Sequence, residues 1–166
     1  YTIKEYLKIY DHLKEINPAI KFSSDFIIGY PGEDDNDFKN TIELIKKIKF
    51  VNSFSFIFNP RPGTPASNLE MADKDVLKKR LLRVQEELFR NQLSMNNSLK
   101  NKIIDVLVEN KMDKSAKFFG RSEYMSSVIL NGTHDDTGKI VKVKIINSNQ
   151  NSLVGEKIKK SELRVA

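Results

Sequence analysis

The sequence predicts two structural classes in one chain, an α/β section followed by a small all-β section. Helical apolar periodicity alternates with short apolar runs over residues 1–97, and short β-branched runs follow over residues 98–166. Charge divides at the same place. Residues 1–97 hold 15 Lys and Arg against 14 Asp and Glu, whereas residues 98–166 hold 13 against eight. The second section therefore carries most of the net charge of +6, which is typical of a polyanionic partner or of a solubilising surface.

The first section reads as helix, strand, helix, strand, helix. Apolar side chains recur at helical spacing in three segments, and the two apolar runs between them are typical of strands. This order favours βα units with parallel strands. The predicted helices span residues 2–16, 35–48 and 73–97, and the predicted strands span residues 20–28 and 51–58.

Capping residues mark the starts of the three predicted helices. Thr2 and Glu5 have the spacing of a capping box, and Asp35 and Asp73 are the expected N-caps of the second and third helices. The chain opens at Tyr1, within a helical pattern and without Met. Two parallel strands also cannot cover their own edges. We therefore interpret this section as the last part of a larger α/β sheet or barrel, in a piece of a longer protein.

The pattern changes near residue 98. Four short runs rich in β-branched residues alternate polar and apolar side chains, with turn signals at Asn131-Gly132 and Thr137-Gly138. Short strands at this spacing predict a small antiparallel barrel or sandwich. Asn96, Asn97 and Ser98 are expected to connect the two sections as a hinge. The predicted strands span residues 102–109, 125–131, 139–146 and 152–158.

Composition excludes several classes of site. The chain has no cysteine, so it can form neither a disulfide nor a cysteine metal site, and its two histidines lie far apart in the sequence. We therefore expect no metal site. No apolar run approaches the ~18 residues that span a bilayer, and the start has no signal-peptide pattern. These features predict a cytoplasmic protein without a membrane partner.

The stretch "DFIIGYPGEDD" (25–35) predicts a turn and a candidate ligand site. It lacks the Lys of a P-loop and the spacing of a dinucleotide-binding loop. Tyr30 to Glu33 fits a type II turn, in which Gly32 supplies the positive φ. The turn does not explain Gly29, which ends the predicted strand where backbone could approach a flat ligand closely. Ligands collect at this end of parallel strands, so the turn and the ligand interpretation both stay open.

A second loop, "NPRPGTP" (59–65), leaves the next strand and should open on the same rim. Its prolines make it rigid, and Arg61 is its only charge. A fixed guanidinium at a strand end suits a carboxylate or a phosphate. The alternative is that Arg61 ties down the loop by hydrogen bonding to carbonyl groups.

The all-β section contains residues that suit RNA. The segment "GRSEYMSSV" (120–128) combines an arginine, a tyrosine and serine hydroxyl groups, which can grip an RNA backbone and stack a base. Lys139, Lys142 and Lys144 lie on or beside one strand, and the last two share a face. A solvated strand face is the alternative interpretation, but the regional charge favours nucleic acid.

Taken in order, these motifs resemble those of the radical-SAM tRNA methylthiotransferases. The similar segments are "SSDFIIGYPGEDDNDF", "FSFIFNPRPGTPA", "GRSEYMSSVILNG" and "NSLVGE", and they cover nearly the whole chain. The resemblance implies that residues 1–97 are the C-terminal βα units of a radical-SAM partial (β/α) barrel. It implies that residues 98–166 are a TRAM domain, a small, OB-like antiparallel β-barrel that binds tRNA.

The resemblance also implies a function. Full-length members of the family use S-adenosylmethionine and two [4Fe–4S] clusters to methylthiolate carbon 2 of a hypermodified adenosine, 3′-adjacent to the anticodon. For this chain we expect that adenosine to be N6-isopentenyladenosine. A cluster needs thiolate ligands, and this chain has none, so we expect it to be inactive alone. The expected partners are the anticodon stem-loop of tRNA and the remainder of the same polypeptide, in a monomer. The alternatives are a methylthiotransferase acting on N6-threonylcarbamoyladenosine and a stand-alone RNA-binding module without catalysis.

Two sets of candidate residues follow. By similarity to the family, the backbone of strand 25–29 contacts the adenine of S-adenosylmethionine, whereas Arg61 is assigned from its position in the loop. No catalytic and no metal-binding residue is expected in this chain. The candidate cofactor-binding residues are Asp25, Ile27, Ile28, Gly29, Phe58 and Arg61. The candidate RNA-binding residues are Arg121, Ser122, Tyr124, Ser127, Lys142 and Lys144.

Overall fold

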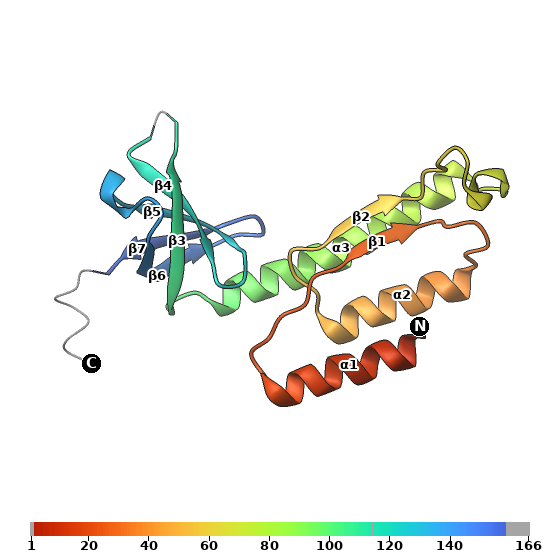
Figure 1. Cartoon of the computed structure of the whole chain (residues 1–166), viewed down its shortest axis with the longest axis horizontal. Coiled ribbons are helices and arrows are strands. Elements are labelled where there is room, and N and C mark those ends of the chain that lie inside the picture. Colours follow the sequence, from red (N-terminus) through yellow and green to blue (C-terminus); the bar gives the residue numbers. More distant parts are fainter. Residues whose placement is uncertain (1, 114, 159–166) are drawn as a thin grey trace.

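Helices and two parallel strands form the first part of the chain in the computed structural model, which describes residues 2–113 and 115–158 (Figure 1). Tyr1 and residues 159–166, the ends of the two predicted sections, lie outside the described residues. The predicted order of helix, strand, helix, strand and helix is confirmed. The elements are α1 (Ile3–Ile16), β1 (Asp25–Ile28), α2 (Asp35–Ile48), β2 (Phe54–Ile57), the short 3₁₀ helix η1 (Pro65–Asn68) and α3 (Lys74–Ser98).

Side-chain caps begin the three helices. Thr2 and Glu5 form the predicted capping box of α1, and Asp73 caps α3 by accepting from the backbone N–H groups of its first turn. The prediction for α2 was wrong by one residue. Asp34 is the N-cap, because its carboxylate accepts from the N–H of Asp37, and Asp35 is the first helical residue.

The two strands expose one face of their sheet and bury the other. They run parallel, with Asp25 beside Phe54 and Ile27 beside Phe56. Phe26 and Ile28 point to the opposite side, where they pack in one cluster with side chains of all three helices. The helices therefore cover a single face of the sheet. The facing helical and loop residues of this cluster include Tyr6, Leu7, Tyr10, Ile42, Ile45, Ile48, Phe50, Val84 and Leu88.

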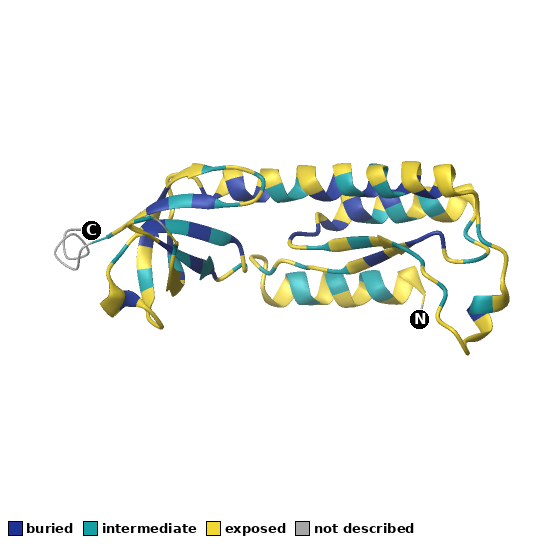
Figure 2. Ribbon diagram, turned by 90° about the horizontal axis from the view of Figure 1, so that it is seen from above, coloured by how far each residue is buried: buried dark blue, intermediate teal, exposed yellow. Residues whose placement is uncertain are grey.

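A closed barrel of five strands forms the second part of the described chain, in the order β3-β4-β5-β7-β6. Its interior is apolar, and buried positions, dark blue in Figure 2, occur along its strands. Alternate residues of each strand point inward, which is the pattern of a packed small barrel. The strands are β3 (Ile103–Lys111), β4 (Lys117–Ser122), β5 (Ser127–Asn131), β6 (Ile140–Ser148) and β7 (Leu153–Lys157), and η2 (His134–Asp136) precedes β6.

The barrel is not entirely antiparallel, and the prediction that it would be was wrong. Four of its neighbouring pairs are antiparallel, but β5 and β7 run parallel. Strand directions cannot alternate strictly around a closed ring with an odd number of members, so one parallel pair is unavoidable. The four predicted strands correspond to β3, β5, β6 and β7, and the prediction missed β4.

Glycine explains why β4 was missed. Gly120 lies in the middle of this strand, and glycine weakens a strand pattern in a sequence. A Cβ atom at Gly120 would lie 2.5 Å from the carbonyl oxygen of Leu107 on β3. Beside it, the register of β3 and β4 shifts between Val108 and Asn110. The glycine is therefore required by a close approach of two backbones at a bulge.

The connection between the two parts is helical. Helix α3 continues through Ser98, so the expected hinge residues form its last turn rather than a loop (Figure 1). Asn96 is only 1% exposed, and its side chain donates to the carbonyl oxygens of Asn149 and Gln150 in the barrel. The buried hydrophobic residues form two clusters, one in each part of the chain. Val51, Met95 and Leu99 come from outside the barrel strands but belong to the cluster of the barrel core.

Candidate cofactor rim and RNA-binding surface

The loop after β1 contains the predicted turn. The N–H of Glu33 donates to the carbonyl oxygen of Tyr30 at 2.9 Å, and Gly32 has a φ of +92°, as a type II turn requires. The ring of Tyr30 meets the ring of Phe58, which follows β2, edge to face at 5.0 Å. The two loops therefore meet at the carboxyl ends of the strands, as the order of elements predicted. We call this region, residues 29–33 and 58–64, the rim.

Gly29 has a backbone conformation that favours glycine, and it lies against helix α3. Its φ is +74°, and a Cβ atom there would lie 2.2 Å from Cδ2 of Leu77 on α3. Its N–H donates to Oε2 of Glu33 at 2.8 Å. Helix α3 therefore approaches Gly29 closely, and the N–H of Gly29 has a partner within the loop. The approach of a ligand to Gly29 stays a prediction.

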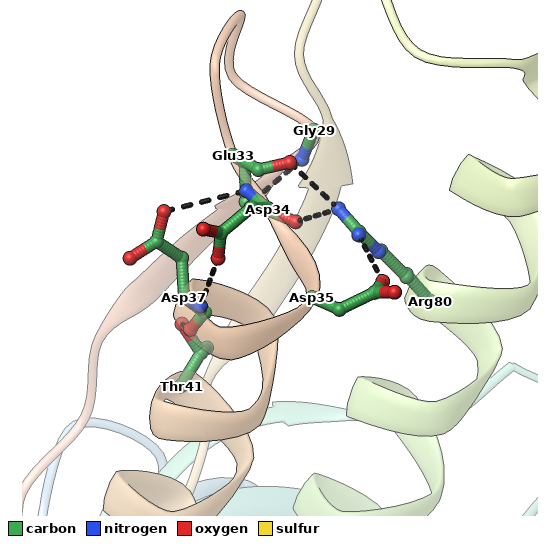
Figure 3. A network of polar contacts seen from close by, with 7 residues as sticks. All are labelled: Gly29, Glu33, Asp34, Asp35, Asp37, Thr41 and Arg80. Atoms are coloured by element: carbon green, nitrogen blue, oxygen red, sulfur yellow. Dashed lines mark hydrogen bonds and ion pairs between the residues drawn. The ribbon is translucent and has the colours of Figure 1, made fainter.

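A buried arginine ties the rim to α3 (Figure 3). Arg80 donates to Oε1 of Glu33 at 2.8 Å and to Oδ1 of Asp35 at 2.6 Å, and its guanidinium lies 5.3 Å from the ring centroid of Phe38. Burial alone would lower the pKa of Arg80, but the hydrogen bonds and charges of Asp35 and Glu33 outweigh that effect and raise it. Arg80 is thus held as a cation that fixes the loop.

Sequence reasoning missed this arginine, although the sequence contains a signal for it. Arg80 lies three residues after Leu77 and four before Val84, on the apolar stripe of the predicted helix. A charge on a buried stripe needs a partner of opposite sign. The acidic residues after Gly32 offered that partner.

The candidate cofactor residues point in different directions. Asp25 is exposed and Ile27 is 58% exposed on the open face of the sheet. Ile28 is 1% exposed and points into the core, so its side chain presents no surface to a ligand. Phe58 is half-buried against Tyr30.

Arg61 is exposed on the rim, and the loop that carries it is held by its backbone. The carbonyl oxygen of Arg61 accepts from the N–H of Thr64 at 3.2 Å and from its hydroxyl group at 2.8 Å. These bonds close a turn that does not use the guanidinium. The charge of Arg61 therefore projects from a fixed loop, which is the arrangement that suits an anion.

Arg121 lies on the outer surface of the barrel beside the α/β section. Its Nη1 donates to the carbonyl oxygen of Met125 at 3.3 Å, its Nε lies 3.7 Å from Glu109, and its guanidinium lies 5.1 Å from the ring centroid of Phe119. In the register of β4 and β5 it stands opposite Ser127, another candidate RNA-binding residue. These two candidates are brought together.

Ser122 and Tyr124 are engaged within the barrel. Ser122 is 4% exposed, and its hydroxyl oxygen accepts from the N–H groups of Tyr124 and Ser126. The hydroxyl group of Ser122 therefore holds a turn and offers no free surface. Tyr124 is half-buried against the barrel core, and its carbonyl oxygen accepts from Nδ2 of Asn52 at 2.5 Å.

Lys142 and Lys144 share the outer face of β6, as the alternation predicted. Lys142 lies beside Asp105 of β3, and its Nζ donates to that carboxylate at 2.8 Å. Lys144 lies between Ile103 and Glu156 in the register of the barrel. Strand β3 separates these lysines from Arg121, so the candidate cations line one outer surface across three strands.

The two candidate regions lie at opposite ends of β1 and β2. Both strands point away from the barrel, so the rim at their carboxyl ends is far from it (Figure 1). The barrel contacts the chain at the start of β2, where Asn52 binds Tyr124. Among the described residues, no group of three or more His, Cys, Asp and Glu side chains could hold a metal ion, and no helix is both long and apolar enough to cross a membrane.

Comparison with known proteins identifies relatives of the whole chain. Residues 97–158 match the TRAM domain family. The tRNA-2-methylthio-N(6)-dimethylallyladenosine synthase of Pelagibacter ubique (strain HTCC1062) is 58% identical over 166 residues, which is 100% of this chain and 37% of that protein.

Two further relatives carry the same name. That of Wolbachia pipientis subsp. Culex pipiens (strain wPip) is 43% identical over 158 residues, and that of Ehrlichia canis (strain Jake) is 40% identical over 159 residues. Each match covers 93% of this chain and 36% of the relative. The chain thus spans little more than a third of the length of the relatives it matches.

Proposed function

Because this chain is homologous over its whole length to part of the tRNA-2-methylthio-N(6)-dimethylallyladenosine synthases, we propose that it is the C-terminal section of a tRNA methylthiotransferase. The whole enzyme would methylthiolate carbon 2 of N6-dimethylallyladenosine (N6-isopentenyladenosine), 3′-adjacent to the anticodon. The observation that carries this proposal is the 58% identity along all 166 residues. We expect the enzyme to act in the cytoplasm as a monomer.

Iron–sulfur clusters do not fit this chain taken alone, because it has no cysteine and clusters need thiolate ligands. The ligands would come from the rest of the polypeptide, and the chain by itself would be inactive. Residues 1–97 would close a radical-SAM partial (β/α) barrel. The exposed apolar side chains of Ile27 and Phe56 support this proposal, because a sheet face covered by helices on one side only is incomplete.

The open face and the rim would hold S-adenosylmethionine. When bound, it would supply the methyl group and the radical chemistry of the reaction. Ile27 would cover one face of its adenine, Asp25 would accept hydrogen bonds on the same side of the sheet, and Arg61 would bind an anionic group of the cofactor or substrate. The network around Arg80 supports this role, since it holds the rim in one shape.

The barrel would bind the anticodon stem-loop. Its TRAM match and its cations on one outer surface support this role. Arg121 and Ser127 would contact the RNA beside the α/β section, while Lys142 and Lys144 would contact phosphate groups further along the barrel. Ser122 and Tyr124 would act through the turn that they hold, which keeps Arg121 in place.

Nucleoside mass spectrometry tests the proposed function. The measurement compares tRNA from cells that contain the full-length protein with tRNA from cells that lack its gene. We expect 2-methylthio-N6-dimethylallyladenosine in the first and the unmethylthiolated nucleoside in the second. Loss of 2-methylthio-N6-threonylcarbamoyladenosine instead would identify the other substrate. An unchanged nucleoside profile would leave a role in RNA binding alone and contradict the catalytic proposal.

A further inference from the structure

A groove of ≈ 370 Å³ and another of ≈ 630 Å³ lie where the barrel meets the α/β section, and the larger one has the features of a binding site. One wall comes from β2 and α3 and includes Phe54 and Phe89. The other wall comes from the barrel and includes Arg121, Met125 and Ser127. The groove is therefore built from residues far apart in the sequence, and it lies at the end of the sheet opposite to the rim.

Apolar side chains are unusually open to solvent in this groove. Phe54 is 64% exposed, Phe89 is 49% exposed and Met125 is 61% exposed, although each could be covered by a ligand between the walls. Aromatic rings and a thioether present flat or adaptable apolar surfaces. Exposed apolar groups gathered in a concave place mark a binding surface, because burying them there releases free energy.

The barrel wall adds polar groups that are only partly occupied. Arg121 uses Nη1 and Nε for Met125 and Glu109, which leaves further N–H donors on its guanidinium. The guanidinium lies over the ring of Phe119, and this cation–π contact helps to hold it in place. Ser127 adds a hydroxyl group opposite Arg121.

Charge distinguishes the kind of ligand. Glu109 is the carboxylate among the described residues that line the groove, and it is paired with Arg121, so the groove is close to neutral. A neutral aromatic groove suits a base better than a phosphate. Phosphate groups suit Lys142 and Lys144, which lie on the same outer surface of the barrel beyond β3. This division of aromatic and cationic surfaces is what single-stranded RNA requires.

The floor of the groove is a satisfied hydrogen-bond network. Gln92 accepts from the N–H of Asn52 at 2.7 Å and donates to Oδ1 of Asn96 at 3.1 Å, and the hydroxyl group of Ser126 donates to the same oxygen at 3.3 Å. Nδ2 of Asn96 donates to Asn149 and Gln150. These bonds join the two walls and hold the groove in one shape.

We propose that the groove between β2, α3 and the barrel binds an unstacked base of the RNA, with Phe89 and Phe54 on one face of the base and Arg121 on the other side. This inference rests on the proposed function, since it names the part of the RNA that the junction of the two sections holds. It adds a base-binding site to the phosphate contacts of the barrel.

Binding of two RNA hairpins to the full-length protein tests the inference by fluorescence anisotropy. One hairpin has a loop of unpaired adenosines, and the other has abasic sites in place of those bases. We expect wild type to bind the intact loop about tenfold more tightly than the abasic loop, because stacking of one base on an aromatic side chain is worth that much. F89A should bind both hairpins with nearly equal affinity.

Leu82 provides the matched control. It lies on α3 two turns before Phe89 and is 60% exposed, but it does not line the groove. L82A should keep the wild-type preference for the intact loop. A wild-type preference that is also kept by F89A would overturn the inference, as would equal binding of both hairpins by wild type. If F89A keeps the preference and lowers the melting temperature, another part of the polypeptide fills the groove. Absence of any RNA binding by wild type would instead contradict the proposed function.

Discussion

The barrel and the α/β section differ in how the edges and faces of their sheets are covered. Each of the described barrel strands pairs on both sides, and a continuous apolar core fills the interior. The described strands β1 and β2 pair only with each other, and one face of their sheet stays open. The barrel is complete as it stands, whereas the α/β section is covered from one side. The difference teaches that one chain can combine a sheet closed on itself with a sheet that its own helices cover on one face only.

The largest effect is expected from a cavity in the closed barrel. Leu130 is 1% exposed in its core, and L130A should lower the free energy of unfolding by about 2–5 kcal/mol, because a closed barrel has no free side into which it can relax. Urea denaturation followed by circular dichroism measures the change. A loss below about 1 kcal/mol would show that the barrel core is loosely packed.

Loss of the Arg80 network should come next. R80M leaves the carboxylate of Glu33, which is 13% exposed, without its cation, and should destabilise the α/β section by roughly 1–3 kcal/mol. Thermal unfolding of the full-length protein is a suitable measurement. K78M is the matched control, since Lys78 is 70% exposed on the same helix and should have little effect. Equal effects of the two variants would contradict the role of Arg80.

Acid should weaken the barrel through Asp136. The hydrogen bond from Lys157 is the main cause that lowers the pKa of this buried carboxyl group below 3.8, and the backbone N–H of Thr133 adds to it. A carboxyl group with a lowered pKa in the folded state contributes stability above its unfolded pKa and loses it as the pH falls. Stability should therefore decrease below about pH 4. D136N should show a shallower decrease in acid denaturation, and an identical pH profile would contradict this.

The smallest effect is expected on the open face. Phe56 is 53% exposed there, and F56A should change the free energy of unfolding of the 166-residue chain by less than about 0.5 kcal/mol. The same variant in the full-length protein should be far more destabilising if further strands cover this face. Denaturation of both proteins in parallel gives the comparison. Equal small effects would show that the face stays open.

The sequence predicted the order of elements well, because helical spacing and capping residues are local signals. Thr2 and Asp73 mark helix starts without reference to the rest of the chain. Strand β4 was missed because Gly120 is required by a contact with Leu107 that no local pattern records. The parallel pair β5–β7 followed from closure of the ring, a property of the whole barrel.

The sites were less predictable because they depend on contacts between residues far apart in the sequence. The turn at Gly32 and the meeting of the two loops followed from strand direction and turn chemistry. The packing of Gly29 against Leu77, far along the chain, could not be predicted from a local pattern, and its role toward a ligand stays a prediction. The charge of Arg121 was evident from the sequence, but the groove beside it also needs Phe89, which lies in the C-terminal half of α3. Only the fold shows that these two residues line the same groove.

Ligand binding by two surface variants of the full-length protein tests the division of labour between the two sections most directly. The variants are R121Q/K144Q in the barrel and I27E on the open face of the sheet, and each is measured with tRNA and with S-adenosylmethionine. We predict that R121Q/K144Q weakens tRNA binding and reduces its salt dependence, while binding of S-adenosylmethionine is unchanged. I27E should weaken binding of S-adenosylmethionine and leave tRNA binding unchanged. The assignment of the two ligands to the two sections would be contradicted if R121Q/K144Q lost binding of S-adenosylmethionine. It would also be contradicted if I27E lost tRNA binding but kept binding of S-adenosylmethionine.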